Sequence, residues 1–258
     1  MATYNKRGYK APKPAELNDV EPADEVFDGK STTAEVFNTL DQGASKTEEW
    51  VEKNQKVIFG VVGAIALVAI GWISYEKFIA APKETEAAEN MFQAEQYFAQ
   101  AVDSPTATDS LYNLALNGGE GKGGFLDIIE QHPGTDAANL AHYNAGMCFL
   151  NIGKYKEAVS HLEEYKTKDD YTKAMALGAT GDAFSQLKDY NSALEYYDKA
   201  ISAVDDDLIT PRFLYKAGML SLDQNKKAEA NKYFTQIKEK YTRSPEATNI
   251  DAYIAMTE

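Results

Sequence analysis

The chain has 258 residues with 26 basic and 40 acidic side chains, which gives it a net charge of −14. A chain this acidic repels the phosphate backbone of nucleic acids, so we expect no nucleic-acid partner. Cys148 is the single cysteine, which excludes an internal disulfide, and the fold has to be stabilised by its core alone.

Residues 1–30 are polar, with three prolines among the first 22 residues and no apolar run. A cleavable signal peptide needs an apolar segment within about the first 30 residues. We therefore predict a disordered cytoplasmic tail rather than a signal peptide.

Residues 31–56 predict short helices next to the membrane. TTAE at residues 32–35 and SKTE at residues 45–48 both fit the capping box that begins a helix. The first of these helices carries three apolar residues on one face, which either lies on the membrane surface or docks a partner. These residues are Val36, Phe37 and Leu40.

Residues 57–75, VIFGVVGAIALVAIGWISY, form a run of 19 residues without a charge. As a helix this run is about 28 Å long, which matches the hydrocarbon core of a bilayer. We predict a transmembrane helix that contacts lipid and continues to residue 81, where Pro82 is expected to break or kink it. Slightly more lysines precede than follow the run, which places the N-terminus in the cytoplasm. They are Lys46, Lys53 and Lys56 before it, and Lys77 and Lys83 after it.

Residues 84–136 predict leading helices. The stretch AAENMFQAEQYFAQAV has helical spacing, and a second helix runs from about residue 109 to residue 116. NGGEGKGG at residues 117–124 departs from the phosphate-loop pattern G-x-x-x-x-G-K-[ST], so we interpret it as a link between helices. The apolar face of the first helix comprises Ala88, Met91, Phe92, Ala94, Phe98 and Val102, with Glu95 among them.

Beyond residue 125 the sequence repeats itself. GMCFLNIGKYKEAVSHLEEY, which begins at Gly146, recurs 35 residues later as GDAFSQLKDYNSALEYYDKA from Gly181. A looser third copy begins at Gly218, 37 residues further on, and the extra residues fall in the acidic turn at residues 205–207.

This pattern resembles the tetratricopeptide repeat, a helix–turn–helix unit of about 34 residues. The resemblance implies an all-α fold, with one transmembrane helix followed by a tetratricopeptide-repeat α-solenoid. It places three repeats at residues 137–244, a degenerate leading repeat at 84–136 and a C-terminal capping helix at 245–258. It also implies that small residues lie where paired helices touch, namely Gly146, Ala158, Gly181, Ala193, Gly218 and Ala230.

The first helices of such repeats line a concave surface that binds partners. The residues projected onto this groove are largely apolar, with two methionines at equivalent positions, which suits adaptable contact with hydrophobic segments. The alternative is that they pack against the capping helix or the leading repeat. The groove residues are Leu140, Tyr143, Met147, Leu150, Asn151, Met175, Asp182, Ser185, Gln186, Arg212, Tyr215, Met219 and Leu222.

Catalytic and metal-binding motifs are missing. His132, His142 and His161 have no metal-ligand spacing, and the aspartates at residues 205–207 lack the glycine and glutamate of a calcium loop. His142 occupies a repeat position that packs between helices. We therefore expect no catalytic residues, no cofactor and no metal.

A cytoplasmic tail, one anchor and a periplasmic tetratricopeptide domain resemble the YfgM-type ancillary subunits of the bacterial Sec translocon. That resemblance implies a single-pass protein of the inner membrane that works beside the protein-conducting channel. Its partners would be translocon subunits, periplasmic chaperones or nascent chains. Two alternatives remain: an envelope scaffold for secretion, cell-wall or outer-membrane assembly, and a regulatory enzyme subunit with its repeats in the cytoplasm.

Overall fold

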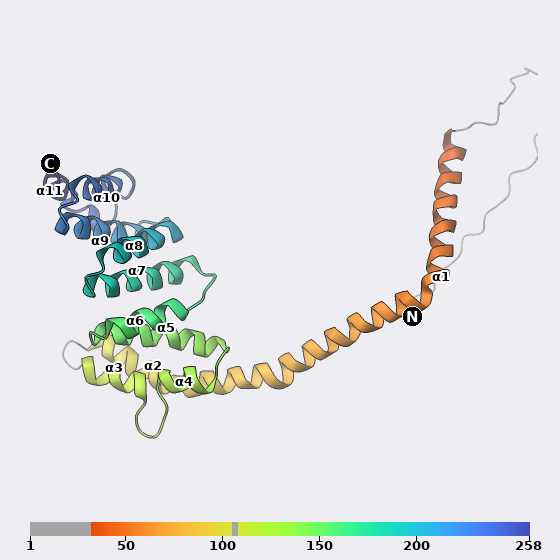
Figure 1. Ribbon diagram of the computed structural model, residues 1–258, viewed down its shortest axis with the longest axis horizontal. Helices are drawn as coiled ribbons and strands as arrows, with labels where there is room; N and C mark the ends of the chain where they lie inside the picture. Colours follow the sequence, from red (N-terminus) through yellow and green to blue (C-terminus); the bar gives the residue numbers. More distant parts are fainter. Residues whose placement is uncertain (1–31, 105–107) are drawn as a thin grey trace, which may run out of the picture. The chain divides into compact units, whose positions relative to one another are not determined.

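The computed structural model describes residues 32–104 and 108–258, with side chains from Glu49 onward except at residue 108. The predicted tail at residues 1–30 lies outside this range, as do the side chains of Val36, Phe37 and Leu40. Within the described residues the regular elements are all helices, which confirms the all-α prediction (Figure 1). The chain divides into two compact units after Leu67, inside the first helix.

The helices follow one another with short connections. The first long helix, its π-helical turn and the next helix are α1 (Thr32–Tyr75), η1 (Glu76–Ala80) and α2 (Ala81–Asp103). Two short helices follow, α3 (Thr108–Asn117) and α4 (Phe125–Gln131). The rest are α5 (Asp136–Asn151), α6 (Tyr155–Glu164), α7 (Asp170–Gln186), α8 (Tyr190–Ala203), α9 (Ile209–Asp223), α10 (Lys227–Lys240), η2 (Pro245–Ala247) and α11 (Ile250–Ala255).

Helix α1 is one element, where the sequence predicted separate short helices before the apolar run. Gly43 and Ser45 have weaker helix propensity than their neighbours, but no proline interrupts the hydrogen-bond ladder there. Among the described residues this is the one helix long and apolar enough to cross a membrane. None of its apolar window is buried by the protein, and Leu67, Val68 and Trp72 are each at least 70% exposed.

Of the two outcomes expected at Pro82, a break or a kink, the break does not occur. It lies at the start of α2, and the chain reaches it through the π-helical turn η1, where the Ala81 N–H donates to the Glu76 carbonyl. Proline has no N–H and crowds the carbonyl four residues earlier. A widened turn just before the proline accommodates both effects, so helical backbone continues from α1 into α2.

Glu84, two residues after Pro82, fastens α2 to the first helix of the repeats. Its two carboxylate oxygens accept hydrogen bonds from the N–H groups of Asp136 and Ala137, at 2.7 and 2.8 Å. These are unpaired donors at the N-terminus of α5, where the helix dipole also favours a negative charge. Lys83 adds a bond from its ammonium to the Pro133 carbonyl, at 2.8 Å.

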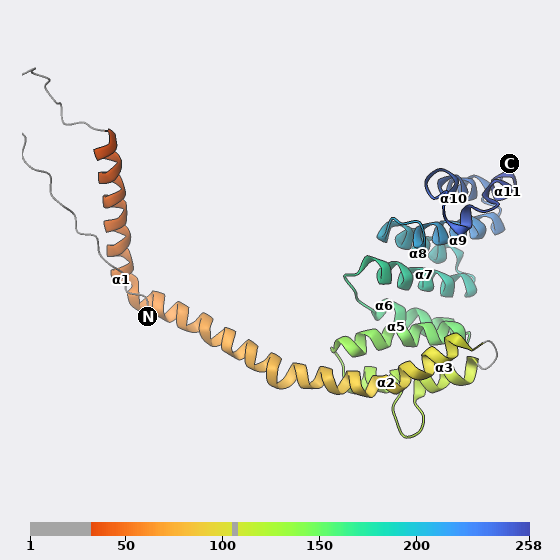
Figure 2. The same cartoon turned by 180° about the vertical axis from the view of Figure 1, so that it is seen from behind.

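The leading helices α2, α3 and α4 form one core with α5, and α2 and α3 lie together beside α5 in Figure 2. The buried face of α2 is displaced from the predicted one, because Phe92 and Val102 are each 60% exposed. The buried face uses Tyr97 in their place, and Phe98 packs its ring against those of Tyr112 and Phe125. The buried residues of α2 are Ala87, Met91, Ala94, Tyr97 and Ala101.

Helices α5–α6, α7–α8 and α9–α10 form three helix pairs with the same turn. The turn residues Gly153, Lys188 and Asn225 have φ of 76°, 63° and 58°, a left-handed conformation that ends each first helix. The next residue in each turn donates its N–H to the carbonyl five residues earlier, at 2.8, 3.0 and 2.8 Å. These turn positions are 35 and 37 residues apart, as the sequence repeats predict.

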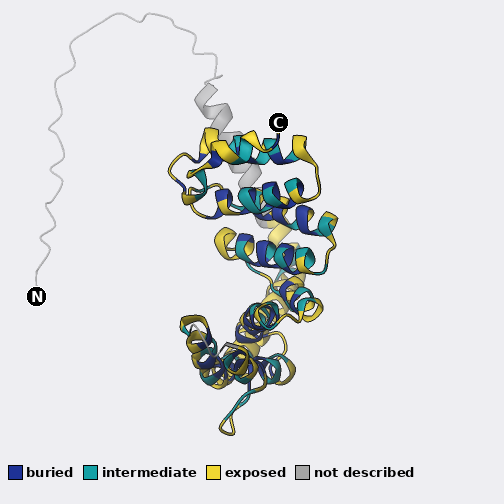
Figure 3. Cartoon of the chain, turned by 90° about the vertical axis from the view of Figure 1, so that its left-hand side faces the viewer, coloured by how far each residue is buried: buried dark blue, intermediate teal, exposed yellow. Residues whose placement is uncertain are grey.

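The two helices of each pair meet at a glycine. A Cβ added to Gly146, Gly181 or Gly218 would come within 2.5–2.7 Å of a side chain on the second helix. The side chains that occupy this space are Leu162, Tyr197 and Phe234, and the second helices also bury Ala158, Ala193 and Ala230 completely. Figure 3 shows the buried surface gathered on the facing sides of the paired helices.

Neighbouring repeats meet at a fourth glycine that the sequence comparison did not reveal. Gly178 of α7 lies against the ring of Phe213 from α9, which occupies the place of a Cβ. Tyr143 and Tyr215 stand at the equivalent positions of the other two repeats. The glycine at this position therefore leaves room for Phe213 of the third repeat. The Phe213 ring also stacks on that of Tyr197, with ring centroids 6.2 Å apart.

We predict that Gly178→Ala destabilises the protein, although alanine normally favours a helix over glycine by about 0.5–1 kcal/mol. The added methyl group overpacks the contact with Phe213, at a net cost of about 1–3 kcal/mol. The thermal midpoint, followed by circular dichroism, should fall by several degrees. The control is Ser202→Ala at an exposed position of α8; a Gly178→Ala midpoint equal to or above that of the control would contradict the predicted contact.

Candidate protein-binding surface

The first helices of the three pairs lie on the concave side of the array. Within the described residues, the backbones of successive first helices, α5 with α7 and α7 with α9, approach closely. The backbones of successive second helices stay farther apart. An array whose first helices are closer together must curve toward them. We call the surface formed by α5, α7 and α9 the first-helix face, and the surface formed by α6, α8 and α10 the second-helix face.

Helix α5 places four apolar residues along the first-helix face. Leu140 is 37% exposed and Met147 is half-buried, whereas Leu150 packs partly on the core of the leading helices. The ring of Tyr143 contacts that of Tyr165 at a tilt of 45°, with ring centroids 5.2 Å apart. Burial raises the pKa of Tyr143, and the positive charge of Arg212 on α9 opposes that rise.

The middle of the first-helix face is polar. Lys216 of α9 lies 2.6 Å from both carboxylate oxygens of Asp182 on α7, and the Tyr197 hydroxyl donates to one of them at 2.8 Å. Burial and the Asp182 charge raise the pKa of Tyr197, so it remains a hydrogen-bond donor. A cleft of about 350 Å³ lies here, lined by Leu150, Tyr155, Asp182, Ser185, Gln186, Tyr197 and Lys216.

At the far end of the groove the C-terminal helix covers the third repeat. Tyr215, Met219 and Leu222 pack partly buried in a cluster that includes Ile250, Tyr253 and Ile254 of the α11 region. The rings of Tyr215 and Tyr253 are 5.2 Å apart, and the hydrogen bond with Tyr253 together with burial raises the pKa of Tyr215 to about 12.

Met175 likewise packs partly buried on the core of the second repeat. The structure therefore separates the predicted groove residues into two groups. Those of α5, with Asp182 and Gln186, line the open part, while the third-repeat residues lie under the C-terminal helix.

The second-helix face carries a repeated contact that sequence reasoning missed. Tyr196 donates its hydroxyl to Glu163 of the preceding repeat, and Tyr233 donates to Asp198 at 2.9 Å. Burial and the bond to Glu163 raise the pKa of Tyr196 to about 12. The signal was present in the sequence, because the acceptors are 35 residues apart and the donors 37, the same spacings as the repeats.

Comparison with known families agrees with this geometry. Tetratricopeptide-repeat models match residues 140–177, 176–203 and 213–244. Residues 140–244 form a tetratricopeptide-repeat array. The unmatched interval between residues 203 and 213 contains the longer acidic turn, and no curated protein matched the sequence.

Tetratricopeptide repeats indicate that this domain binds other proteins. Within the described side chains, no cluster of three histidine, cysteine or acidic groups is arranged to hold a metal ion.

Two histidines face each other inside the first tetratricopeptide repeat. Their Nδ1 atoms, on His142 of α5 and His161 of α6, are 3.2 Å apart, and the His161 ring stacks on Phe149 at 5.3 Å. Burial lowers the pKa of both imidazoles, and the neighbouring His142 lowers that of His161 further. Glu164 opposes both shifts, and Lys166 adds to that of His142.

We predict that the repeat domain loses stability as the pH falls below about 6.5, the ordinary pKa of histidine. The unfolded chain then binds protons that the folded pair excludes, so the free energy of unfolding decreases. His161→Gln removes one of the two groups and should reduce this loss. Thermal midpoints of both proteins at about pH 7.5 and about pH 5.5 measure the difference; an equal fall in the two proteins would show that the pair contributes nothing.

Proposed function

We propose that this protein is a single-pass membrane protein whose tetratricopeptide repeats hold protein segments close to the bilayer, as an accessory of the protein-translocation or envelope-biogenesis machinery. Its N-terminus would lie in the cytoplasm of a bacterium and its repeat domain in the periplasm. Its partners would be translocon subunits, periplasmic chaperones or nascent chains.

The observation that carries this proposal is the continuity between the apolar helix and the binding domain. The exposed apolar run passes through η1 into α2 without a break, and Glu84 then fastens α2 to α5. Helix α5 bears the open apolar part of the first-helix face. A helix that buries its apolar run in lipid therefore leads directly to the element that would contact the partner.

The chemistry of the open groove favours a segment with apolar and polar sides. Leu140, Tyr143 and Met147 supply apolar surface, and methionine adapts its shape to different side chains. The Asp182–Lys216 pair lies beside this strip and offers both charges to polar groups of the segment. Each apolar side chain buried on binding is worth roughly 1.5–3 kcal/mol before the cost of ordering.

The predicted topology is tested with protease on spheroplasts that express the full chain. Protease should digest the repeat domain from outside and leave a protected membrane fragment that contains residues 1–56. A control cytoplasmic protein must stay intact in the same sample. Digestion of the repeat domain only after lysis would place it in the cytoplasm and contradict the role in translocation.

The groove is tested with the double substitution Leu140→Ser and Met147→Ser. Losing two apolar contacts should weaken photo-crosslinking to translocon components and nascent chains by more than tenfold. The matched control is Leu208→Ser with Met256→Ser, which removes the same two residue types at positions that are 69% and 56% exposed. Equal crosslinking by the two double variants, at equal thermal midpoints, would place the contact elsewhere.

A further inference from the structure

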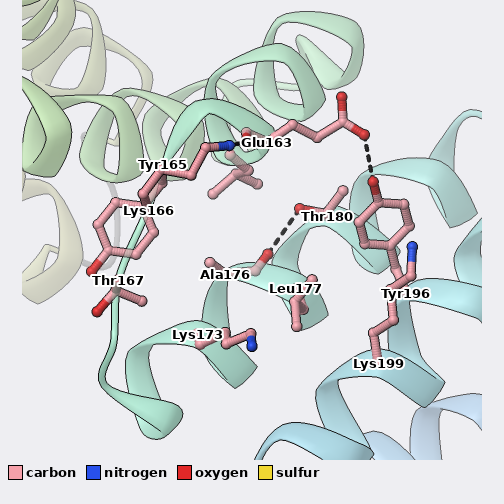
Figure 4. A pocket seen from close by; sticks show the side chains of 11 residues that line it. Glu163, Tyr165, Lys166, Thr167, Lys173, Ala176, Leu177, Thr180, Tyr196 and Lys199 are labelled. Carbon is pink, nitrogen blue, oxygen red and sulfur yellow. Dashed lines mark hydrogen bonds between the residues drawn. The ribbon is translucent and has the colours of Figure 1, made fainter.

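The second-helix face has a cleft of its own between the first and second repeats (Figure 4). It has a volume of about 390 Å³ and lies between α6 and α8, with α7 as its floor. On α7, Lys173, Leu177 and Thr180 face this cleft. Asp182 and Gln186 line the first-helix face, and at 3.6 residues per turn they project from the other side of the helix.

The cleft combines an apolar floor with lysines around it. Leu162, Ala176 and Leu177 supply the floor, and Lys166, Lys173 and Lys199 surround it. The Lys166 ammonium donates to the Glu163 carbonyl at 2.6 Å, and Lys199 pairs with Glu195 at 2.7 Å.

The side-chain ammonium of Lys173 has no hydrogen bond or ion pair with any described residue. One cationic group beside the apolar floor is therefore open to an outside partner.

This cleft is not a general consequence of the repeat fold. Between the second and third repeats, the positions equivalent to Lys166 and Ala176 hold Ile201 and Phe213, and both apolar side chains pack in the core of the second repeat. The position of Lys173 is Thr210 there, and that threonine is 1% exposed. The residues at these three positions therefore decide whether the contact between two neighbouring repeats is packed or forms an open, basic cleft.

The charge around the cleft is opposite to that of the chain. Its lining has three lysines and one acid, Glu163, within a protein of net charge −14. The Glu163 carboxylate already accepts the hydroxyl of Tyr196.

A shallower cleft of about 580 Å³ shares Lys173, Leu177 and Lys199 with the first and continues along α8. It adds two carboxylates, Glu195 and Asp198, and two small side chains, Ser202 and Ala203, so the lysines of the first cleft are followed by acidic groups. This elongated groove, with polar groups of both signs, fits an extended protein segment better than a lipid headgroup, which would favour uniform positive charge.

We propose that this cleft binds an acidic protein segment, which places an apolar side chain on Leu162, Ala176 and Leu177 and its carboxylates beside Lys166 and Lys173. The site lies on the face opposite the concave groove, so it does not depend on the function proposed for that groove. The domain would then hold two protein segments at once, one on each face.

The test uses the full chain in nanodiscs of zwitterionic lipid and a fluorescein-labelled peptide with one leucine between two pairs of aspartates. Binding is measured by fluorescence anisotropy. Lys173→Glu should weaken binding by about tenfold or more, because it replaces an attraction with a repulsion. Lys156→Glu is the matched control: it makes the same charge change in the first turns of α6, at an exposed position away from the cleft, and should leave binding unchanged.

Two further measurements define the outcome. A peptide with serine in place of leucine should bind several-fold more weakly, and a benzophenone in place of leucine should crosslink to α7 or α8 near Leu177 and Tyr196. No binding, equal weakening by both lysine variants, or crosslinks to α5 around Met147 would each overturn the proposal. So would binding to phosphatidylglycerol vesicles that depends on Lys173 when the peptide does not bind, because the cleft would then be a lipid site.

Discussion

The close approach of helices at glycine residues is the constraint on which the rest of the array depends. Gly146, Gly181 and Gly218 let a side chain of the second helix reach the backbone of the first. Gly178 does the same between repeats, for Phe213. Because interiors are packed as densely as organic crystals, such contacts leave little freedom in the distance between helices. Repetition of this spacing curves the array and gathers the first helices on one surface.

The second fixed relation is between the array and the helix that precedes it. The N-terminus of α5 has its free N–H groups satisfied from two sides, by Glu84 of α2 and by the hydroxyl of Thr135. A helix end capped by a distant element links the two segments as well as stabilising the helix. Since α2 continues from η1 as helix, the first repeat is held to the end of the apolar run by hydrogen bonds and by continuous backbone.

The repeat fold could be predicted from sequence because its determinants recur. Glycine and alanine positions, the turn and the spacings of 35 and 37 residues each appear more than once, so a chance match at one position matters little. The π-helical turn before Pro82 could not be predicted in the same way, because a proline within helical sequence is compatible with a break, a kink or a widened turn. The buried face of α2 was misjudged at Phe92 and Val102 because helical spacing identifies apolar stripes, but not which stripe a neighbour covers.

The two proposed binding surfaces were harder to predict because they depend on where the repeats differ. Projection of the repeat pattern placed Tyr143 and Tyr215 on one groove, but α11 covers the second of them. The sequence beyond residue 245 predicted a capping helix but did not show which of its residues would make that contact. The basic cleft was missed for the same reason, since a consensus pattern hides the positions at which one repeat departs from its neighbours.

The clefts on the two faces of the array all involve the second repeat, and this follows from its place in the array. Helix α5 packs against the leading helices and α9 against the C-terminal segment, so the outer repeats use much of their surface for closure. The second repeat has repeats on both sides and can carry polar residues where the others need packing. Asp182 replaces the methionines Met147 and Met219, and Lys173 replaces Ala138 and Thr210, which are 3% and 1% exposed. One helix, α7, thus presents a carboxylate to one face and a free ammonium to the other, so both proposed binding surfaces take their central charge from the same element.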